Sequence, residues 1–446
     1  QHITQDNKTT NYSARVSYTE PLTLQRNLEI NYGYSWQEIG NNRKNYNVDP
    51  ISGTENFVDS SSNIYTNTLS NHRIGMNLRT TLKKYNYTIG LSAQPSTIST
   101  NSITGKTEFV NHVINYNPVV RIAYNFSKSR SLNINYNGNT SQPSNTQLQP
   151  VTDKSNPQFI TIGNPSLKPE FANTFSMRYN NFDYISGNVF FGNISFSFTK
   201  DKIVSSTKLL EAGAQETRYL NTDGYYFATA FYNISRPYKN RKYVINLGGN
   251  VSYSNNVSFV RDLNDQDIKN TGKNWVASQR LAVDIKIKKW LETNLTVNYS
   301  INNFKNNLQT DLNSNAVNWV LSHNSRIFLP LDFIISYDAE KTFFNGYSGN
   351  NQNINPFIIN ATIEKQFLEK KNLSVKLQGF DLLRENVGIS RNVSSNGFTD
   401  TRTNRLGNYY MLGLVWRINK FKGDMQQGGG MNMQMMPGGG EMRMRF

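Results

Sequence analysis

The sequence predicts an all-β protein, a transmembrane antiparallel up-and-down β-barrel with about 17 strands in this chain. Three observations carry this prediction. Apolar and polar residues alternate along most of the chain, short connections alternate with long ones, and the polar face of the segments carries Asn, Ser, Thr, Arg and Lys. A second packed sheet would require an apolar inner face, so this polar face suits a wet lumen.

Period-two alternation marks each expected strand, because successive side chains of a strand point to opposite faces. Residues 242–254 are the clearest case, and residues 293–302 repeat the pattern. Further segments of this kind lie, in chain order, at residues 28–36, 74–78, 85–91, 120–126, 132–136, 190–198, 281–287, 333–337 and 373–377. Each is near the ~9–11 residues that a tilted strand needs to cross a bilayer. Helical patterns are brief, at residues 206–216 and 380–386, and both lie in connections.

The connections between these segments form two classes that differ in length. Short, polar turns occur at residues 82–86, 127–131, 237–242, 287–292, 329–332 and 368–372, and they alternate with longer stretches rich in Asn, Ser, Thr, Asp and Gly. A transmembrane barrel has short periplasmic turns and long external loops, whereas a soluble sandwich has no reason to alternate the two lengths. The pattern therefore favours a membrane barrel over a soluble all-β protein.

The number of strands predicts the direction of the first one. If the short turns are periplasmic and the last strand, about residues 408–421, ends there, the segment at residues 11–18 runs inward from the outside. A complete single-chain barrel usually has an even strand count with both ends in the periplasm. We therefore expect this chain to be part of a ~22-strand barrel whose N-terminal strands are missing from it.

Aromatic residues are expected to mark the edges of the membrane. Trp36, Trp275, Trp290 and Trp416 lie near the ends of predicted strands. An indole ring suits the membrane interface because its apolar body meets water through one polar edge. Trp290, beside a basic turn, is the clearest case.

Composition narrows the classes of function. The chain has 37% apolar residues, no cysteine, and four histidines, His2, His72, His112 and His323, that are far apart in sequence. Thiol chemistry and Cys-based zinc sites are excluded, and no paired metal motif or Ser-His-Asp arrangement can be assembled. The net charge of +16 is scattered, which favours solvated and turn positions over nucleic-acid binding. We expect neither an enzyme nor a cofactor.

The stretch GNPSLKPEFANTFSMRYN, residues 163–180, begins as a stiff turn and ends as an alternating strand. It resembles an extracellular-loop motif of TonB-dependent receptors, and the residues that match are Gly163, Asn164, Pro165, Leu167, Lys168, Pro169 and Glu170. Residues 379–421 are similar to the last two strands and final loop of TonB-linked outer-membrane barrels of Bacteroidetes. The resemblance implies an outer-membrane location, and a parent protein with a plug and a TonB box that are missing from this chain.

The motif has a structural interpretation that we favour over a catalytic role for Glu170. Pro165 and Pro169 remove two amide donors and push the preceding residues to extended geometry, so sheet pairing stops there. Glu170 then meets an amide or a basic side chain where pairing resumes. Beyond Phe171, the expected lipid face is Phe175, Met177 and Tyr179, and the expected lumen face is Ser176, Arg178 and Asn180.

Two groups of carboxylates are candidates for chemistry. Asp338 and Glu340 lie on one strand face, about 7 Å apart, but Lys341 adjoins them and no nucleophile follows, which favours a charged pair facing the lumen. The second group is Asp262, Asp265 and Asp267, whose oxygens could bind Ca²⁺. This stretch lacks the Gly and terminal Glu of an EF-hand loop, which favours an ordinary polar external loop.

We divide the chain into a barrel portion, residues 1–421, and a Gly- and Met-rich periplasmic tail, residues 422–446. Gly runs without periodicity predict that the tail is disordered. Flexible Met side chains also adapt to protein grooves and bind Cu(I), so docking to a periplasmic partner and soft-metal binding are the alternatives. The residues proposed for docking are Met431, Met433, Met435 and Met436.

The leading hypothesis for function is a TonB-dependent outer-membrane receptor that binds or imports a ligand through its extracellular loops. The alternative is a barrel that no longer transports and serves as a structural subunit of an outer-membrane complex. The expected partners are outer-membrane lipid, the TonB system through the missing N-terminal region, and a lipoprotein or other complex partner, but no nucleic acid. The sequences of the loops do not indicate which ligand is bound.

Overall fold

The computed structural model describes residues 2–417, apart from residues 60–61, 105–106, 149–151, 154–155, 157, 211–212, 263, 288, 309, 346–354, 370, 387, 395–396 and 405. Within these residues the chain forms a 22-stranded sheet and a separate two-stranded sheet. The short helical elements include α1 (Asn145–Leu148), η3 (Thr310–Leu312) and η4 (Pro330–Asp332). No helix in the described part of the chain is long and apolar enough to span a membrane. The predicted all-β class is confirmed.

Seventeen strands follow one another as an up-and-down meander in which every neighbouring pair is antiparallel. They are β1 (His2–Thr23), β2 (Arg26–Val48), β4 (Asn63–Thr81), β5 (Tyr85–Ser102), β6 (Thr107–Ser127), β7 (Arg130–Ser141), β10 (Glu170–Phe182), β11 (Val189–Lys200), β14 (Tyr225–Tyr238), β15 (Tyr243–Arg261), β16 (Asp267–Ile287), β17 (Leu291–Asn306), β18 (Ser314–Phe328), β19 (Phe333–Asn345), β20 (Phe357–Phe367), β21 (Leu373–Phe380) and β24 (Tyr409–Trp416). This number agrees with the prediction.

Shorter strands lie within the long connections. They are β3 (Glu55–Phe57), β8 (Thr152–Asp153), β9 (Phe159–Ile162), β12 (Lys202–Leu209), β13 (Gln215–Thr222), β22 (Ile389–Ser394) and β23 (Gly397–Arg402). β12 and β13 form an antiparallel hairpin, β9 pairs in parallel with β13, and β22 pairs with β23.

Both helical predictions are wrong. Residues 206–209 belong to β12, because pairing with β13 and with β15 satisfies the backbone and overrides a weak helical propensity. The second segment, at residues 380–386, is a turn that follows β21, in which Asp381 and Arg384 have φ values of 47° and 59°.

The two faces of the meander differ sharply in polarity. One row of register partners on successive strands is Ile122, Ile134, Met177, Ile194, Ala230, Val251, Ala277, Ile301 and Val317. The adjacent row points to the opposite face and is Ala123, Asn133, Arg178, Asn193, Phe231, Asn250, Ser278, Ser300 and Asn318. We call these faces the apolar face and the polar face. Phe175 and Met177 lie on the apolar face, and Ser176 and Arg178 lie on the polar face, as predicted.

The apolar face is exposed rather than packed against a second layer. Ile194 is 52% exposed, Leu295 51% and Leu377 50%, although each sits within a strand of the meander. Such a continuous exposed apolar surface marks contact with lipid or with another protein. Nine apolar side chains are buried among the described residues, and four of them, Ile98, Leu148, Leu167 and Ile203, form a small cluster near one end of the strands.

The apolar face changes to a polar one at a tryptophan. In β2 the successive residues on this face are Leu28, Ile30, Tyr32, Tyr34 and Trp36, followed by Glu38, Gly40, Asn42 and Lys44. In β16 the change occurs at Trp275, with Lys273 and Lys269 beyond it. Trp36 lies about ten residues from the start of β2, which is the length that a tilted strand needs to cross a bilayer.

The prediction that Trp36 and Trp275 lie near strand ends is therefore wrong. β2 has 23 residues and β16 has 21, so both strands continue well beyond the apolar band. Trp290 and Trp416 do lie near the other ends of their strands, and they are 48% and 67% exposed. The tryptophans consequently stand at both edges of the apolar band, where indole rings are favoured in membrane barrels.

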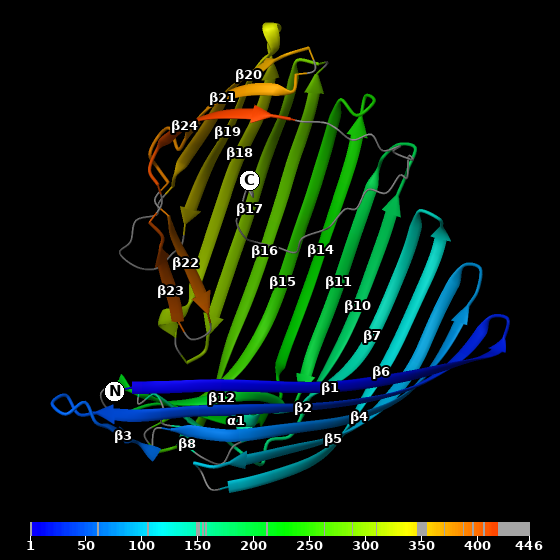
Figure 1. The fold of residues 1–446 in the computed structure, drawn as a ribbon. Coiled ribbons are helices and arrows are strands. Elements are labelled where there is room, and N and C mark those ends of the chain that lie inside the picture. The colour runs from blue at the N-terminus through cyan, green and yellow to red at the C-terminus, as the bar shows by residue number, and fades with distance from the viewer. Residues whose placement is uncertain are drawn as a thin grey trace.

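Figure 1 shows the meander as one strongly curved wall. At one end the strands are joined by short turns at residues 24–25, 82–84, 128–129, 183–188, 239–242, 288–290, 329–332 and 368–372, and we call this the short-turn end. The other end carries the long connections, together with shorter ones between β5 and β6 and between β15 and β16, and we call it the long-connection end. β1 runs toward the short-turn end, the direction that strand counting predicts. Among the described residues, no pairing joins β1 to β24.

Candidate functional site

The long-connection end carries an ordered assembly of connecting segments. It comprises α1, β8, β9, the β12–β13 hairpin and residues 163–169, which lead into β10. Figure 1 shows β12, α1 and β8 together at the end of the long central strands. β12 also pairs with the end of β15 through Ser206 and Thr207, which attaches the hairpin to the wall of the sheet.

The first half of the sequence motif fastens this assembly through Asn164. Its amide N–H donates to the carbonyl of Gln147 in α1 over 2.6 Å. Its side-chain Nδ2 donates to the carbonyl of Tyr219 in β13 over 3.0 Å, and its Oδ1 accepts from the Ser166 amide over 3.0 Å. One asparagine therefore links the turn, the helix and the hairpin.

Leu167 provides the apolar contact of the motif. It is 4% exposed and packs in the cluster with Ile98, Leu148 and Ile203. These residues come from β5, α1 and β12, so the cluster joins segments that are distant in sequence. The sheet exposes its apolar face, so it buries little apolar area there. Burial of apolar area in this cluster is therefore the main stabilising contribution for the connecting segments.

The second half of the motif binds the base of the hairpin. Lys168 exchanges two hydrogen bonds with Asn221: its amide donates to Oδ1 over 2.8 Å, and its carbonyl accepts from Nδ2 over 2.9 Å. Pro165 and Pro169 have no amide hydrogen, and residues 163–169 belong to no strand. The motif is thus a connection held by specific contacts rather than by sheet pairing.

Structural contacts hold the Glu170 carboxylate against the hairpin. Oε2 accepts from Lys202 Nζ over 3.0 Å, and Oε1 accepts from the Ile203 amide over 2.8 Å. Both donors belong to β12, which begins where pairing of β10 resumes. This geometry fits the structural interpretation of Glu170, because each of its oxygens accepts a hydrogen bond from β12.

A cluster of ion pairs lies beside the hairpin and is centred on Arg261. The Arg261 side chain is 1% exposed, with its guanidinium 2.9 Å from Glu216 and 3.5 Å from Asp265. Arg218 lies 3.3 Å from each of the same two carboxylates, and Lys208 lies 3.0 Å from Asp265. A buried arginine needs such partners, because its charge cannot be removed by deprotonation.

The three aspartates of the calcium hypothesis do not converge. Asp265 binds the cations just described, Asp267 accepts a hydrogen bond from Ser206, and Asp262 accepts from the Gln266 amide over 2.8 Å. The hydrogen bond from Lys208 is the largest influence on Asp265 and, with the nearby charges, holds the pKa of its carboxyl below the ordinary value of 3.8. Within the described ranges, no three His, Asp or Glu side chains are grouped to hold a metal ion.

The carboxylates of β19 lie on the polar face, as the alternation predicts. Asp338 accepts a hydrogen bond from Asn360 Nδ2 over 2.5 Å, and Glu340 accepts from Ser322 Oγ over 3.2 Å. These donors come from the strands on either side. The pair contributes charge to the polar face, and its neighbours in the register rows are Asn324, Asn360, Ser322 and Ile358.

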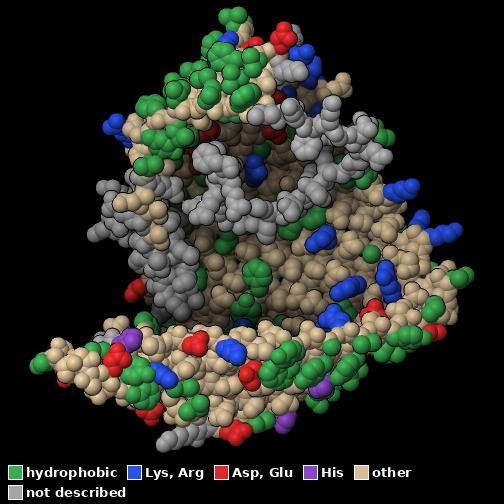
Figure 2. All heavy atoms as spheres, in the orientation of Figure 1, with side chains coloured by type: hydrophobic (Ala, Val, Ile, Leu, Met, Phe, Trp, Pro, Cys, Tyr) green, Lys and Arg blue, Asp and Glu red, His purple; other side chains and the backbone are tan. Residues whose placement is uncertain are grey.

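The polar face carries both basic and acidic residues along the wall. Basic residues on β4, β6 and β10 are Arg73, Arg79, Arg121 and Arg178. On β16 to β20 the same face carries Asp284, Glu292, Asp338, Glu340 and Glu364 together with Arg280, Lys286 and Arg326. Lys286 lies 3.7 Å from Glu292. None of the four arginines on β4, β6 and β10 forms an ion pair within the described part of the chain. Figure 2 shows the hollow of the sheet, lined mainly by uncharged polar surface with Lys and Arg at several points.

Sequence reasoning missed this group of arginines on neighbouring strands. Alternation assigns Arg121 and Arg178 to the polar face, but it does not say that neighbouring strands contribute further arginines there. Arg79 and Arg121 stand in one register row, with Thr88 between them. The candidate docking residues Met431, Met433, Met435 and Met436, and the whole tail at residues 422–446, lie outside the described residues.

Residues 1–282 and 266–416 match the outer membrane protein beta-barrel family. The match confirms the predicted barrel class and the predicted location in the outer membrane. No curated protein matches the chain.

Three solved structures with detectable similarity are two siderophore receptors and a copper transporter. The siderophore receptor PirA from Pseudomonas aeruginosa has 11% identity and a TM-score of 0.38, with 92% of this chain and 71% of that chain covered. The copper transporter OprC has 7% identity and a TM-score of 0.40, with 92% and 66% covered. The siderophore receptor PirA from Acinetobacter baumannii has 11% identity and a TM-score of 0.26, with 92% and 74% covered.

Proposed function

The chain belongs to the outer membrane protein beta-barrel family, and from this premise we propose that it is the barrel portion of a TonB-dependent receptor. Its long-connection end faces the outside and binds a ligand, which then passes along the polar face of the wall. The motif at residues 163–170, with its resemblance to an extracellular loop of such receptors, supports this orientation.

The observation that carries the proposal is the group of four arginines on the polar face, Arg73, Arg79, Arg121 and Arg178, that form no ion pair among the described residues. A wall that only supported a membrane complex would have no need for four arginines without carboxylate partners on β4, β6 and β10. Guanidinium groups on a concave surface attract anionic groups and hold them by paired hydrogen bonds. We therefore assign Arg121 and Arg178 to ligand contact during passage.

Closure of the barrel is part of the same proposal. β1 and β24 each have one edge without a partner strand among the described residues. In lipid, every backbone donor and acceptor must be paired, so membrane sheets occur as closed barrels. We propose that further strands join these two edges, and that a plug fills the lumen and couples it to the TonB system.

A structural subunit of an outer-membrane complex is the second candidate. Its support is the rigid construction of the long-connection end, where Asn164, Leu167 and Arg261 hold the connections in one arrangement. A pre-formed surface of this kind suits a permanent protein partner such as a lipoprotein. In that case the Met residues of the tail would provide a second contact on the periplasmic side.

A growth experiment separates the two functions. One strain lacks this gene, a second lacks active TonB protein, and both grow with iron, copper, cobalamin or an oligosaccharide as the single limiting nutrient. Import requires that both strains fail on the same nutrient and that the intact gene restores growth. A structural subunit instead requires that gene loss alters the abundance of other outer-membrane proteins in rich medium, while TonB inactivation has no such effect.

A pair of variants tests the polar face directly. Arg121→Gln with Arg178→Gln removes two charges from the wall and is expected to lower uptake of the identified nutrient severalfold at unchanged protein abundance. The matched control, Lys8→Gln with Lys44→Gln, removes two charges from the other face beyond the apolar band and is expected to leave uptake unchanged. Equal uptake by both double variants contradicts the role assigned to the arginines.

A further inference from the structure

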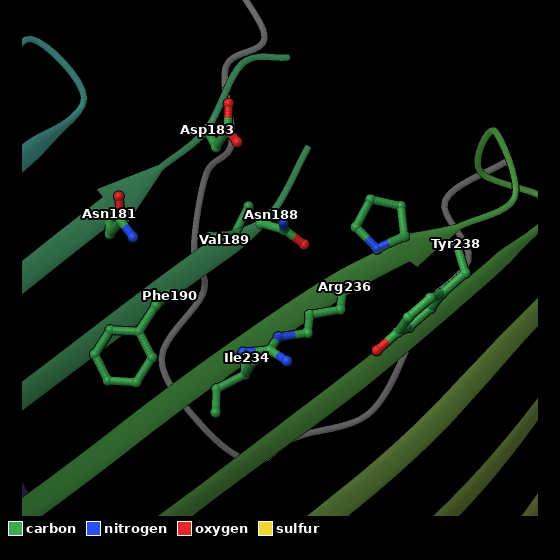
Figure 3. Close-up of a pocket in the computed structure, with 9 residues that line it drawn as sticks. Asn181, Asp183, Asn188, Val189, Phe190, Ile234, Arg236 and Tyr238 are labelled. Atoms are coloured by element: carbon green, nitrogen blue, oxygen red, sulfur yellow. The ribbon is translucent and has the colours of Figure 1, made fainter. Parts of the chain in front are cut away.

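A pocket with a volume of about 440 Å³ lies at the short-turn end, far from the long connections. Its walls come from β10, β11, β14 and the turn at residues 183–188, and they include Asn181, Asn188, Phe190, Ile234, Arg236 and Tyr238. Figure 3 shows the Arg236 side chain extended toward Ile234, with Phe190 on the neighbouring strand. Neither the proposed ligand path nor the sequence motif involves this pocket.

The pocket opens on the apolar face. Asn181, Phe190 and Ile234 are register partners on three adjacent strands. On the apolar face they form the row next to the one that contains Tyr179 and Tyr232. The centroids of the Phe190 and Tyr179 rings are 5.7 Å apart, so the aromatic surface continues from the pocket along the apolar face. One side of the pocket is therefore continuous with the surface that faces lipid acyl chains.

The other side of the pocket is basic. Arg236 is the last residue but two of β14, and Arg241 follows in the turn to β15. A Cβ atom on Gly187 would lie 3.2 Å from Arg241 Nη2, so the Arg241 guanidinium reaches the turn that closes the pocket. Neither arginine forms an ion pair among the described residues.

Asp183 contributes the negative charge of the pocket, but residues of its own turn already donate hydrogen bonds to its carboxylate. Its carboxylate accepts from Ser186 Oγ over 2.5 Å and from the Ile185 amide over 2.9 Å. The Ser186 hydroxyl is the main cause that lowers the pKa of Asp183, followed by the turn amides. The carboxylate is therefore satisfied locally, and the two arginines remain available to an external anion.

Positive charge also surrounds the pocket along the whole short-turn end. The described residues of the short turns include the basic residues Lys83, Lys84, Lys128, Lys239, Arg241, Lys242, Lys289 and Lys371, against the acidic residues Asp183, Asp332 and Glu369. Lys371 and Asp332 form an ion pair of 2.5 Å. This excess lies just beyond the apolar band, at the depth where lipid phosphates are found.

We propose that this pocket binds the phosphate-bearing headgroup of an anionic phospholipid, with Arg236 and Arg241 on the phosphate and the acyl chains along Phe190 and Ile234. Arginine suits this task because its planar fork binds phosphate oxygens in pairs. Its long aliphatic stem also lies on apolar surface while the charge stays at the interface. The remaining basic residues of the short turns raise the local concentration of anionic lipid.

A lipid explains the site better than a free anion does. A soluble anion would gain nothing from Phe190 and Ile234, and salt screens an exposed charge within about 8 Å at physiological ionic strength. An anionic lipid remains at the membrane surface and combines both contacts. The site is independent of the proposed transport, since it lies on the opposite face of the wall from Arg121 and Arg178.

Lipid binding can be counted by native mass spectrometry of the delipidated, folded full chain in detergent. Phosphatidylglycerol and phosphatidylethanolamine are titrated separately, and glycerol 3-phosphate serves as the soluble probe. We expect tighter binding of phosphatidylglycerol, and Arg236→Gln is expected to weaken its tightest site about fivefold, the effect of one interfacial charge. Arg236→Lys should lose less, since it keeps the charge but not the fork.

The matched control is Lys289→Gln, which removes one exposed charge from the same end of the barrel outside the pocket. It is expected to change binding less than twofold. Equal losses in R236Q and K289Q would overturn the pocket, as would equal binding of the two lipids or displacement of phosphatidylglycerol by equimolar glycerol 3-phosphate. If R236Q does not reach the heat-modifiable folded form on gels, Arg241→Gln replaces it with the same expected direction.

Discussion

The two ends of this barrel wall use the same basic residues in opposite ways. At the long-connection end, Arg261 and Lys202 are paired with Glu216 and Glu170 inside an ordered assembly. At the short-turn end, Arg236 lines an open pocket, and Arg241 and Lys242 follow in the adjacent turn. None of these three residues forms an ion pair among the described residues. The difference indicates that charge stabilises the fold at one end and is available to the membrane at the other.

The largest expected effect distinguishes a buried from an exposed arginine. Arg261→Met leaves Glu216 and Asp265 partly uncompensated and is expected to cost about 3 kcal/mol in the stability of the β12–β15 region. Hydrogen exchange of the β12 and β13 amides measures this loss. The control, Arg241→Met, is expected to cost less than about 0.5 kcal/mol because its side chain is exposed. Similar losses in both variants would remove the contrast between the ends.

A leucine at each end gives the second comparison. Leu167→Ala empties part of the buried cluster and is expected to cost about 2–3 kcal/mol. Leu24, in a short turn, is 108% exposed, and Leu24→Ala is expected to change stability by less than about 0.5 kcal/mol. Limited proteolysis within the β12–β13 hairpin is the direct readout. Unchanged protection of the hairpin in L167A would show that the cluster does not hold it.

Acid is expected to loosen the long-connection end through Asp265. Because cations lower the pKa of this carboxyl in the fold, its contribution is complete above about pH 4 and is lost as pH falls through the lowered folded-state value. Hydrogen exchange of β12 and β13, corrected for intrinsic rates, should therefore accelerate below pH 4. Asp265→Asn should exchange faster at pH 6 and lose most of this pH dependence. A wild-type hairpin equally protected at pH 6 and pH 3 would contradict this role.

The smallest effects are expected for lysines of the two ends. Lys202→Gln removes the ion pair with Glu170, whose side chains are 30% and 16% exposed, and is expected to cost about 1 kcal/mol. Lys83→Gln with Lys84→Gln removes two charges from a short turn and should change stability by less than about 0.5 kcal/mol. Thermal unfolding, followed by gel mobility, compares the stability of the two variants. A larger loss of stability in the double variant would contradict the conclusion that charge stabilises the long-connection end and not the short-turn end.

Much of the fold was predictable because alternation is a local property. The seventeen strands of the meander agree with the expected number, and Phe175 and Ser176 lie on the predicted faces. The failures occur where distant segments meet. Residues 206–209 look helical by themselves but pair with β13 and β15, and Trp36 lies within a long strand rather than near its end.

The candidate sites divide in the same way. The residue types of the motif indicate a stiff turn, yet nothing in residues 163–170 names Asn221, Tyr219 or Lys202 as its partners. In the sequence, the basic residues of the short turns look like separate solvated positions. Their alignment along one end of the barrel, beside the pocket at Arg236, follows from the antiparallel meander that carries every second connection to the same side.

Period-two polarity and alternating connection lengths were thus sufficient for the barrel class, the two faces and the direction of β1, since each depends only on neighbours in the chain. Which carboxylate satisfies Arg261, which segments bury Leu167 and which charges stand unpaired depend on residues that are far apart in sequence. The register between strands brings these residues together, and the identity of one residue does not specify its partner on another strand.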